Sequence, residues 1–236
     1  CHIRRGGADF RRYSGGADGV AETRKAGGRP AVGVTPLTPE AFAAVCDVSR
    51  ETLQRLGRYA DILVKWQKSI NLVAPESVKD LWRRHILDSA QLQAFLPPRV
   101  QVLVDMGSGA GFPGLVLAIL GVPNVHLIES DARKCVFLAE AARAAGLDVG
   151  SNPTIHRSRL EDVVDLRADV VTARACAPLR QLLTYAEPLL KPDTICLFPK
   201  GARVDEELTE AEKTWRMSVE RFPSLSDPSG TILRMK

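Results

Sequence analysis

The chain combines an acidic residue with closely spaced glycines in one stretch, Asp105-Met106-Gly107-Ser108-Gly109-Ala110-Gly111-Phe112-Pro113-Gly114. Alternating glycines let a backbone turn sharply and approach a ligand without β-carbons in the way. The stretch lies between two apolar segments, residues 100–106 and 115–120, which are typical of a buried strand and a helix. A doubly wound sheet places its ligand crevice at such a strand-to-helix turn, so this loop is the predicted binding site.

Two cofactor classes fit this loop. The spacing Gly109-x-Gly111-x-x-Gly114 matches the dinucleotide fingerprint, so the glycines alone do not choose between them. Asp105 favours S-adenosylmethionine, because an acidic residue at the strand end repels a pyrophosphate but suits the ammonium group of a methionine. Glu129 ends the next apolar segment and is expected to accept hydrogen bonds from a ribose diol. A nicotinamide oxidoreductase, a non-catalytic RNA-binding module and a glycine turn without a ligand remain alternatives.

The elements that must position this loop follow a regular pattern. Beyond Pro98, apolar segments alternate with segments of helical periodicity. Such alternation predicts an α/β fold, with a doubly wound, mostly parallel sheet covered by helices on both faces. A closing antiparallel pair is expected at the end of the chain. The expected strands are residues 100–106, 125–128, 154–156, 169–172, 194–198, 218–222 and 231–235, and the expected helices are residues 115–120, 131–145, 179–190 and 205–215.

From Thr38 the sequence pattern becomes helical. Three helices are predicted, over residues 38–47, 49–66 and 79–96, and the last is ended by Pro97-Pro98. These helices are expected to form an N-terminal cap on the α/β domain of residues 99–236, and not an independent domain.

Charge separates the first 35 residues from the rest of the chain. Of the 32 basic and 28 acidic side chains, seven and three lie in residues 1–35, which leaves 25 of each sign in residues 36–236. An Arg/Gly-rich segment without hydrophobic periodicity cannot offset its ordering entropy, so residues 1–35 are predicted to be a disordered extension, with an RNA-binding arm as the alternative. Any RNA bound by the folded part must meet a local patch of charge.

The cysteines and the lengths of the apolar runs limit the classes of protein to which the chain can belong. Five scattered cysteines without a CxxC pair and four scattered histidines indicate neither a disulfide framework nor a zinc cluster, so no metal is predicted. No apolar run reaches the roughly 18–20 residues of a membrane span, and the basic start lacks the apolar core of a signal peptide. We therefore expect a soluble protein of a reducing compartment, the cytoplasm, with no membrane partner.

Several sequence blocks recur, in this order, in a known bacterial family. They are Lys65-Trp66-Gln67-Lys68 with Asn71-Leu72, Arg84-His85-Ile86-Leu87-Asp88-Ser89, the glycine loop ending in Phe112-Pro113-Gly114, Ser158-Arg159-Leu160-Glu161, Ala173-Arg174-Ala175 and Lys200-Gly201. By these blocks, residues 40–236 resemble the bacterial small-subunit rRNA guanine-N7 methyltransferase family, also called glucose-inhibited division protein B. The chain departs from the family pattern at Val73, Ala173 and Pro199, and none of these departures removes a charged group.

The resemblance implies a class I methyltransferase that carries a methyl group from S-adenosylmethionine to N7 of guanine 527, in the 530 loop of 16S rRNA. The implied partner is 16S rRNA or a small-subunit ribosomal particle, and we expect a monomer. To the cofactor residues Asp105, Gly107, Gly109, Gly111 and Glu129, the resemblance adds Phe112, Leu160, Glu161 and Arg174. Four cations fall in loops at strand ends and are expected to contact RNA phosphates, with solvated surface charge as the alternative for each: Arg133, Lys134, Arg159 and Lys200.

Methylation of guanine N7 needs no acid–base pair, because N7 carries an available lone pair at neutral pH. Positioning and exclusion of water suffice, and Arg174 is expected to supply the positioning, with a surface ion pair as the alternative. Cys176 follows Ala175 and not a proline, so it is expected to be a buried spectator and not a nucleophile. His85 and Asp88 lie three apart on one predicted helix face. They are expected to line the site or, as the favoured alternative, to form a hydrogen-bonded clasp against the sheet.

Overall fold

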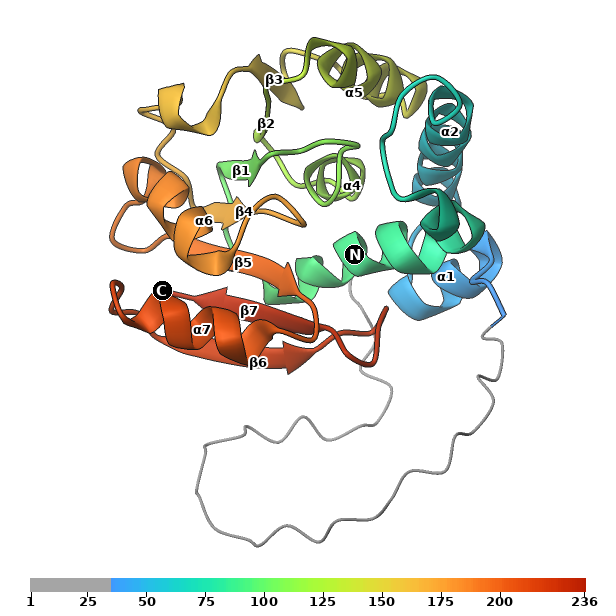
Figure 1. Cartoon of the computed structure of the whole chain (residues 1–236). Helices are drawn as coiled ribbons and strands as arrows, with labels where there is room; N and C mark the ends of the chain where they lie inside the picture. Colours follow the sequence, from blue (N-terminus) through green and yellow to red (C-terminus); the bar gives the residue numbers. More distant parts are fainter. Residues whose placement is uncertain (1–34) are drawn as a thin grey trace, which may run out of the picture.

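One seven-stranded sheet organises the computed structural model, which describes residues 35–236 (Figure 1). The strand order is β3-β2-β1-β4-β5-β7-β6, in which β1 to β5 are parallel and β7 runs antiparallel to both β5 and β6. The predicted α/β fold is confirmed, and so is the closing antiparallel pair. The predicted extension lies outside the described residues except for Thr35. The strands are β1 (Leu103–Met106), β2 (Val125–Glu129), β3 (Thr154–Arg157), β4 (Val170–Thr172), β5 (Ile195–Lys200), β6 (Val219–Pro223) and β7 (Thr231–Met235).

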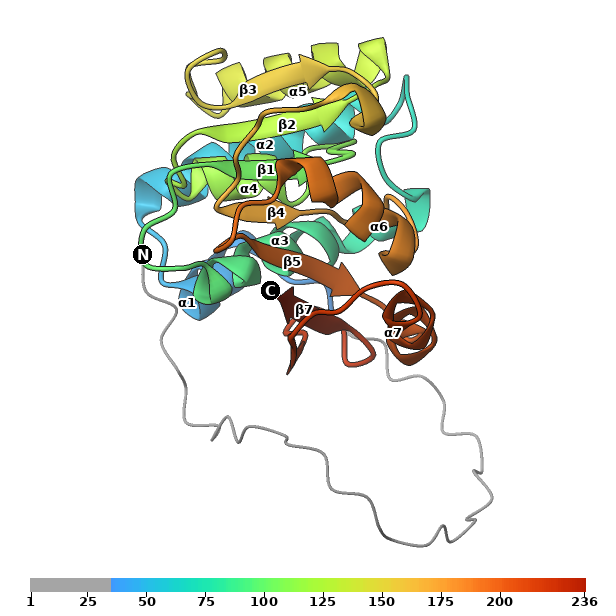
Figure 2. The ribbon, with the colours of Figure 1, turned by 90° about the vertical axis from the view of Figure 1, so that its left-hand side faces the viewer.

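Helices cover both faces of this sheet (Figure 2). Four helices and two short 3₁₀ turns belong to the α/β part: α4 (Gly114–Ile119), α5 (Ala132–Ala144), η4 (Leu160–Asp162), α6 (Leu179–Ala186), η5 (Glu187–Leu189) and α7 (Val204–Glu212). Successive side chains of a strand point to opposite faces. Leu103 of β1 accordingly packs in one buried cluster with α4, α5 and the N-terminal helices, whereas Val104 and Met106 pack in a second cluster with α6 and α7.

Side-chain caps start the first two helices where the sequence predicts them. The Thr38 hydroxyl accepts a hydrogen bond from the backbone of α1 (Pro39–Cys46) at 3.2 Å. The Ser49 hydroxyl accepts one from the backbone of α2 (Arg50–Trp66) at 3.0 Å. Both oxygens satisfy N–H groups that have no partner within the helix.

The third predicted helix is a chain of short helical segments. It starts at Pro75 and not near residue 79, because proline suits the first position of a helix, and it ends before Pro97-Pro98 as predicted. Its middle is a π-helical turn, a form that occurs frequently at functional sites. The segments are η1 (Pro75–Asp80), η2 (Trp82–Leu87, π-helical), α3 (Asp88–Ala90) and η3 (Gln91–Phe95).

The N-terminal helices share one hydrophobic core with the sheet. Phe42 and Leu56 are fully buried in the same cluster as Leu103. Tyr59 of α2 is also fully buried, and its hydroxyl donates a hydrogen bond to the Ala110 carbonyl of the glycine loop at 2.5 Å. Helix α2 therefore supports the glycine loop through this hydrogen bond. We propose on this basis that residues 36–98 act as a cap on the α/β domain of residues 99–236.

The variant Tyr59→Phe tests this support. It leaves the buried Ala110 carbonyl without its donor, which costs about 1–3 kcal/mol. We expect the free energy of unfolding in urea to fall by that amount with an unchanged m value. Tyr185→Phe is the control, because the hydroxyl of this half-buried tyrosine contacts the exposed Gln181 and its loss should change little. Equal stability of Tyr59→Phe and the wild type would show that the hydroxyl does not support the loop.

Candidate functional site

A cavity of about 1480 Å³ opens at the carboxyl ends of the parallel strands. Ligands of doubly wound sheets bind at this edge. The cavity extends from the glycine loop and Glu129 to the loop between β6 and β7. A residue beyond each parallel strand lines it: Gly107 after β1, Ser130 after β2, Ser158 after β3, Arg174 after β4 and Gly201 after β5.

Two carboxylates hold the glycine loop in place. Glu129, 8% exposed at the end of β2, accepts hydrogen bonds from the N–H groups of Gly109 and Asp131, each at 2.8 Å. Asp105, the penultimate residue of β1, accepts one from the Gly114 N–H at 3.1 Å. The loop is thus fixed at both of its ends by the protein itself. Glu129 also lines the cavity, and its contact with a ribose stays a prediction.

Asp105 is a fully buried carboxyl group beneath the glycine loop. Its second oxygen, Oδ1, has no hydrogen-bond partner among the described residues. Burial raises the pKa of Asp105 to about 7. A buried carboxylate oxygen without a partner is costly. Asp105 lies behind the loop and does not itself line the cavity, so its contact with the ammonium group of a ligand stays a prediction.

The three predicted cofactor glycines do different things. Gly107 has a φ of +65°, and a β-carbon there would lie 2.5 Å from the Cys176 sulfur. At Gly109 a β-carbon would meet nothing closer than 3.7 Å, so this position is open. Gly111 does not line the cavity, and its β-carbon would lie 2.9 Å from Leu115. Its φ of +92° and its close packing against α4 both favour a glycine there, and its contact with the cofactor stays a prediction.

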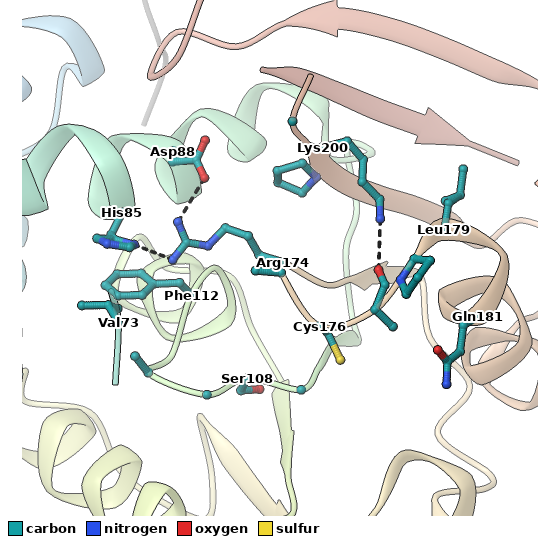
Figure 3. Close-up of a pocket in the computed structure, with 18 of the residues that line it drawn as sticks. Val73, His85, Asp88, Ser108, Phe112, Arg174, Cys176, Leu179, Gln181 and Lys200 are labelled. Carbon is teal, nitrogen blue, oxygen red and sulfur yellow. Dashed lines mark hydrogen bonds and ion pairs between the residues drawn. The ribbon is translucent and has the colours of Figure 1, made fainter. Parts of the chain in front are cut away.

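Arg174 is clasped by residues of the N-terminal cap (Figure 3). Its Nη1 donates to the Asp88 carboxylate at 3.1 Å and to the Arg84 carbonyl at 3.0 Å, and its Nη2 donates to His85 Nδ1 at 2.6 Å. The guanidinium carbon lies 4.8 Å from the centre of the Phe112 ring. The predicted clasp of His85 and Asp88 is confirmed, and both residues also line the cavity.

The Phe112 ring packs against His85, Tyr59 and Arg174. Its ring stacks on His85 at 5.0 Å between centroids and lies 5.4 Å from the ring of Tyr59. Arg174 covers it at the cavity, so the residue is only 3% exposed. Phe112 nevertheless lines the cavity, and its expected contact with the cofactor stays a prediction.

The other predicted site residues fall into two groups. Leu160 and Glu161 line the cavity from η4, and Lys134 and Arg159 line it as well. Arg133 lies in an adjoining cavity of about 410 Å³, which it shares with Lys134. Within residues 35–236, no ion pair involves Arg133, Lys134 or Arg159, so their charges are available to a ligand.

Two residues differ from what was expected. Lys200 lines the cavity, but its ammonium is not free for a phosphate, because it pairs with Glu207 of α7 at 2.7 Å and donates to the Ala177 carbonyl; the side chain is 8% exposed. Cys176 is exposed and lines the cavity, whereas a buried residue was expected; it follows Ala175, whose φ is 50°, and its sulfur lies against Gly107 of the glycine loop.

Some residues of the site had no predicted role. Arg84, Arg203 and Asp227 line the cavity, and Ser77 lies behind His85. Arg84 belongs to the Arg-His-Ile-Leu-Asp-Ser block, so this motif could have been used to predict a role for Arg84 at the site. Arg203, Asp227 and Ser77 belong to no motif, and only the packing of the chain brings them to the cavity.

The family model described as GidB, rRNA small subunit methyltransferase G, matches residues 52–232 of the chain. The chain belongs to this family. A member from Rhodospirillum rubrum, Ribosomal RNA small subunit methyltransferase G, is 57% identical over 199 residues, which cover 84% of this chain and 97% of that protein. The protein of that name from Paramagnetospirillum magneticum is 53% identical over 200 residues, or 85% of this chain and 96% of that protein.

Solved structures share the fold of this rRNA small subunit methyltransferase G family member. The ribosomal protein L11 methylase of Lactobacillus delbrueckii subsp. bulgaricus has a TM-score of 0.54 at 16% identity, over 64% of this chain and 76% of that one. A mutant of MtNAS in complex with S-adenosylmethionine also has a TM-score of 0.54. It is 15% identical, and the match covers 85% of this chain and 84% of that one. These similarities confirm the class I methyltransferase fold. Family membership favours the methyl donor over the dinucleotide that the glycine spacing left open.

The pH dependence of cofactor affinity tests the role of Asp105. With a pKa near 7 this carboxyl is neutral at pH 6 and charged at pH 8, and only the charged form attracts an ammonium group. We expect S-adenosylhomocysteine to bind about tenfold more weakly at pH 6 than at pH 8 in calorimetry, the effect of one proton titrating near pH 7. Asp105→Asn keeps an acceptor for the Gly114 N–H but should bind weakly, with only the ligand's own pH dependence. Identical pH profiles of wild type and variant would remove Asp105 from the cofactor site.

Proposed function

We propose that this chain transfers a methyl group from S-adenosylmethionine to N7 of guanine 527, in the 530 loop of 16S rRNA. Membership of the rRNA small subunit methyltransferase G family supports the reaction class and the RNA substrate. The structural observation that carries the proposal is the cavity of about 1480 Å³, which runs from the glycine loop past Arg174 to the β6–β7 loop. This volume exceeds the roughly 300–1,000 Å³ of a pocket for one small ligand, and so has room for a donor beside an extruded nucleotide.

The residues around the glycine loop fit S-adenosylmethionine. Asp105 offers an unpartnered carboxylate oxygen beneath the loop for the ammonium group, and Glu129 offers carboxylate lone pairs at the cavity for the ribose. Leu160 and Glu161 would border the adenine from η4. When bound, S-adenosylmethionine supplies a methyl group attached to a sulfonium cation.

Methylation of guanine N7 requires the protein to position the base, but it requires no proton transfer. The N7 lone pair is available at neutral pH, so the protein must align the guanine with the methyl group and exclude water. The Cys176 thiol is poorly suited to act as a nucleophile, because partial burial and the carboxylates of Asp105 and Glu129 raise its pKa. We therefore assign Arg174 the role of orienting the guanine, with no residue acting as acid or base.

The charge of Arg174 is balanced at the place where the reaction moves a positive charge. Methyl transfer shifts that charge from the donor to the guanine, and an unpaired guanidinium beside the base would oppose the shift. Asp88 forms an ion pair with Arg174 at 3.1 Å, and both side chains are 16% exposed. The pair therefore presents hydrogen-bond donors to the cavity without adding net charge.

RNA phosphates are proposed to bind the free cations around the cavity. Four of these cations line the large cavity: Lys134, Arg159, Arg84 and Arg203. Arg133 lines the adjoining smaller cavity. Lys200 is left out because Glu207 already neutralises it.

The partner proposed is 16S rRNA, or a small-subunit ribosomal particle that contains it. We further propose that the enzyme acts as a monomer in the cytoplasm, since ribosomal RNA is modified where ribosomes are assembled. Among residues 35–236, no helix has both the length and the apolar character that crossing a membrane requires.

Mass mapping of 16S rRNA from cells with and without the gene tests the proposal. We expect the N7 methyl group of the 530-loop guanine to disappear in the deletion strain and to return with the wild-type gene. Arg174→Ala should not restore it, whereas Arg221→Ala should, because Arg221 is an exposed residue of β6 that pairs with Asp205 outside the cavity. A methyl group that persists in the deletion strain would show that another protein installs it.

A further inference from the structure

The hydrogen bonds from Arg174 through His85 and Ser77 allow only one assignment of donors and acceptors. Arginine carries donors and no acceptor, so the 2.6 Å contact of Arg174 Nη2 with His85 Nδ1 makes this nitrogen the acceptor. The proton of the imidazole then sits on Nε2, which donates to the Ser77 hydroxyl at 2.7 Å. The Ser77 hydroxyl donates in turn to the Ala74 carbonyl at 2.6 Å. The chain of contacts ends on a carbonyl, so every donor in it has an acceptor.

This order of donors requires a neutral imidazole. A protonated His85 would carry N–H groups on both nitrogens, and one of them would face the N–H group of Arg174. Burial and the neighbouring charges of Arg174 and Arg84 lower the pKa of His85 to about 3. The ring is therefore neutral, with its proton on Nε2, throughout the pH range of enzyme assays.

The ring is also fixed in space. It lies in the π-helical turn η2, is 8% exposed and stacks on Phe112 at an interplanar angle of 25°. Ser77 holds one ring nitrogen and Arg174 occupies the other, as the close-up of the cavity shows for Arg174 (Figure 3). Asp88, one helical turn away, holds the other end of the guanidinium.

We propose that His85 is a positioning residue for methyl transfer that acts through Arg174. Its imidazole, oriented by Ser77, accepts from Nη2 and so holds the guanidinium in place over the Phe112 ring. Three of the five N–H groups of Arg174 are engaged by Asp88, Arg84 and His85, which leaves two for an oxygen acceptor of the substrate nucleotide. The inference rests on the proposed function, in which Arg174 orients the guanine.

Two substitutions of His85 separate positioning from packing. His85→Asn keeps an acceptor near the place of Nδ1, whereas His85→Phe keeps the stacked ring and loses the acceptor. We expect His85→Phe to lower kcat at saturating RNA about tenfold, as loss of one hydrogen bond to a charged group would, with S-adenosylhomocysteine affinity unchanged within about twofold. His85→Asn should recover most of that loss. His156→Asn is the control, because His156 lies on β3 outside the cavity and should keep full activity.

A double substitution tests whether His85 acts through Arg174. In an Arg174→Lys background the clasp is already lost, so adding His85→Phe should lower kcat no further. The inference is overturned if the two losses multiply, or if His85→Asn and His85→Phe lose activity and thermal stability equally. A fully active His85→Phe would overturn it as well.

A spectroscopic readout keeps this inference separate from the proposed function. In the ¹⁵N spectrum of the wild-type protein, the His85 Nδ1 signal should be that of an unprotonated nitrogen, and Arg174→Lys should shift it. Averaged signals of two tautomers would contradict the hydrogen-bond order even if the enzyme methylates RNA. Conversely, the expected spectrum in a protein that methylates no guanine would refute the proposed function and leave the contact itself intact.

Discussion

The site depends on two carboxylates near the carboxyl ends of neighbouring parallel strands, which hold the glycine loop between them. Asp105 and Glu129 each accept a backbone N–H of that loop, at Gly114 and Gly109 respectively. Because the protein's own carboxylates satisfy these N–H groups, the loop has its shape before a ligand enters. Each carboxylate keeps acceptor capacity, Glu129 at the cavity and Asp105 through its unpartnered Oδ1. Glu129 thus both fixes the loop and faces the cavity, whereas Asp105 fixes the loop from behind it; under the proposed function these two side chains meet the hydroxyl and ammonium groups of the ligand.

The opposite wall depends on a second junction, at Asp88. This carboxylate meets Arg174 beyond β4, and its Oδ1 accepts hydrogen bonds from Gln91 at 3.0 Å and from Ser226 of the β6–β7 loop at 2.6 Å. Three parts of the chain that are distant in sequence are joined here: the N-terminal cap, the parallel sheet and the C-terminal hairpin. Residues of the N-terminal helical segment thus line the cavity and also belong to the hydrophobic core that this segment shares with the sheet.

Much of this was predictable because it is local. Apolar periodicity located the strands and helices, the glycine loop located the ligand edge, and the three-residue spacing of His85 and Asp88 placed both on one face. Partner choice was not predictable, since Arg174 lies 86 residues from Asp88 and reaches it only through the packed fold. The same reason accounts for the errors. Lys200 is neutralised by Glu207 of α7, and Cys176 follows Ala175, whose φ is 50°, and lies exposed at the cavity. The insertion of β7 between β5 and β6 likewise leaves no mark in a single sequence.

The claim that the two carboxylates both build and use the glycine loop is tested most directly by a crystal structure with S-adenosylhomocysteine. The account predicts ribose hydroxyls within hydrogen-bond distance of Glu129 while Gly109 still donates to that carboxylate. It also predicts that the amino group, directly or through one water, satisfies Asp105 Oδ1. A ligand bound away from Glu129, or a loop that releases the Gly109 N–H from Glu129 to take up the ligand, would contradict it.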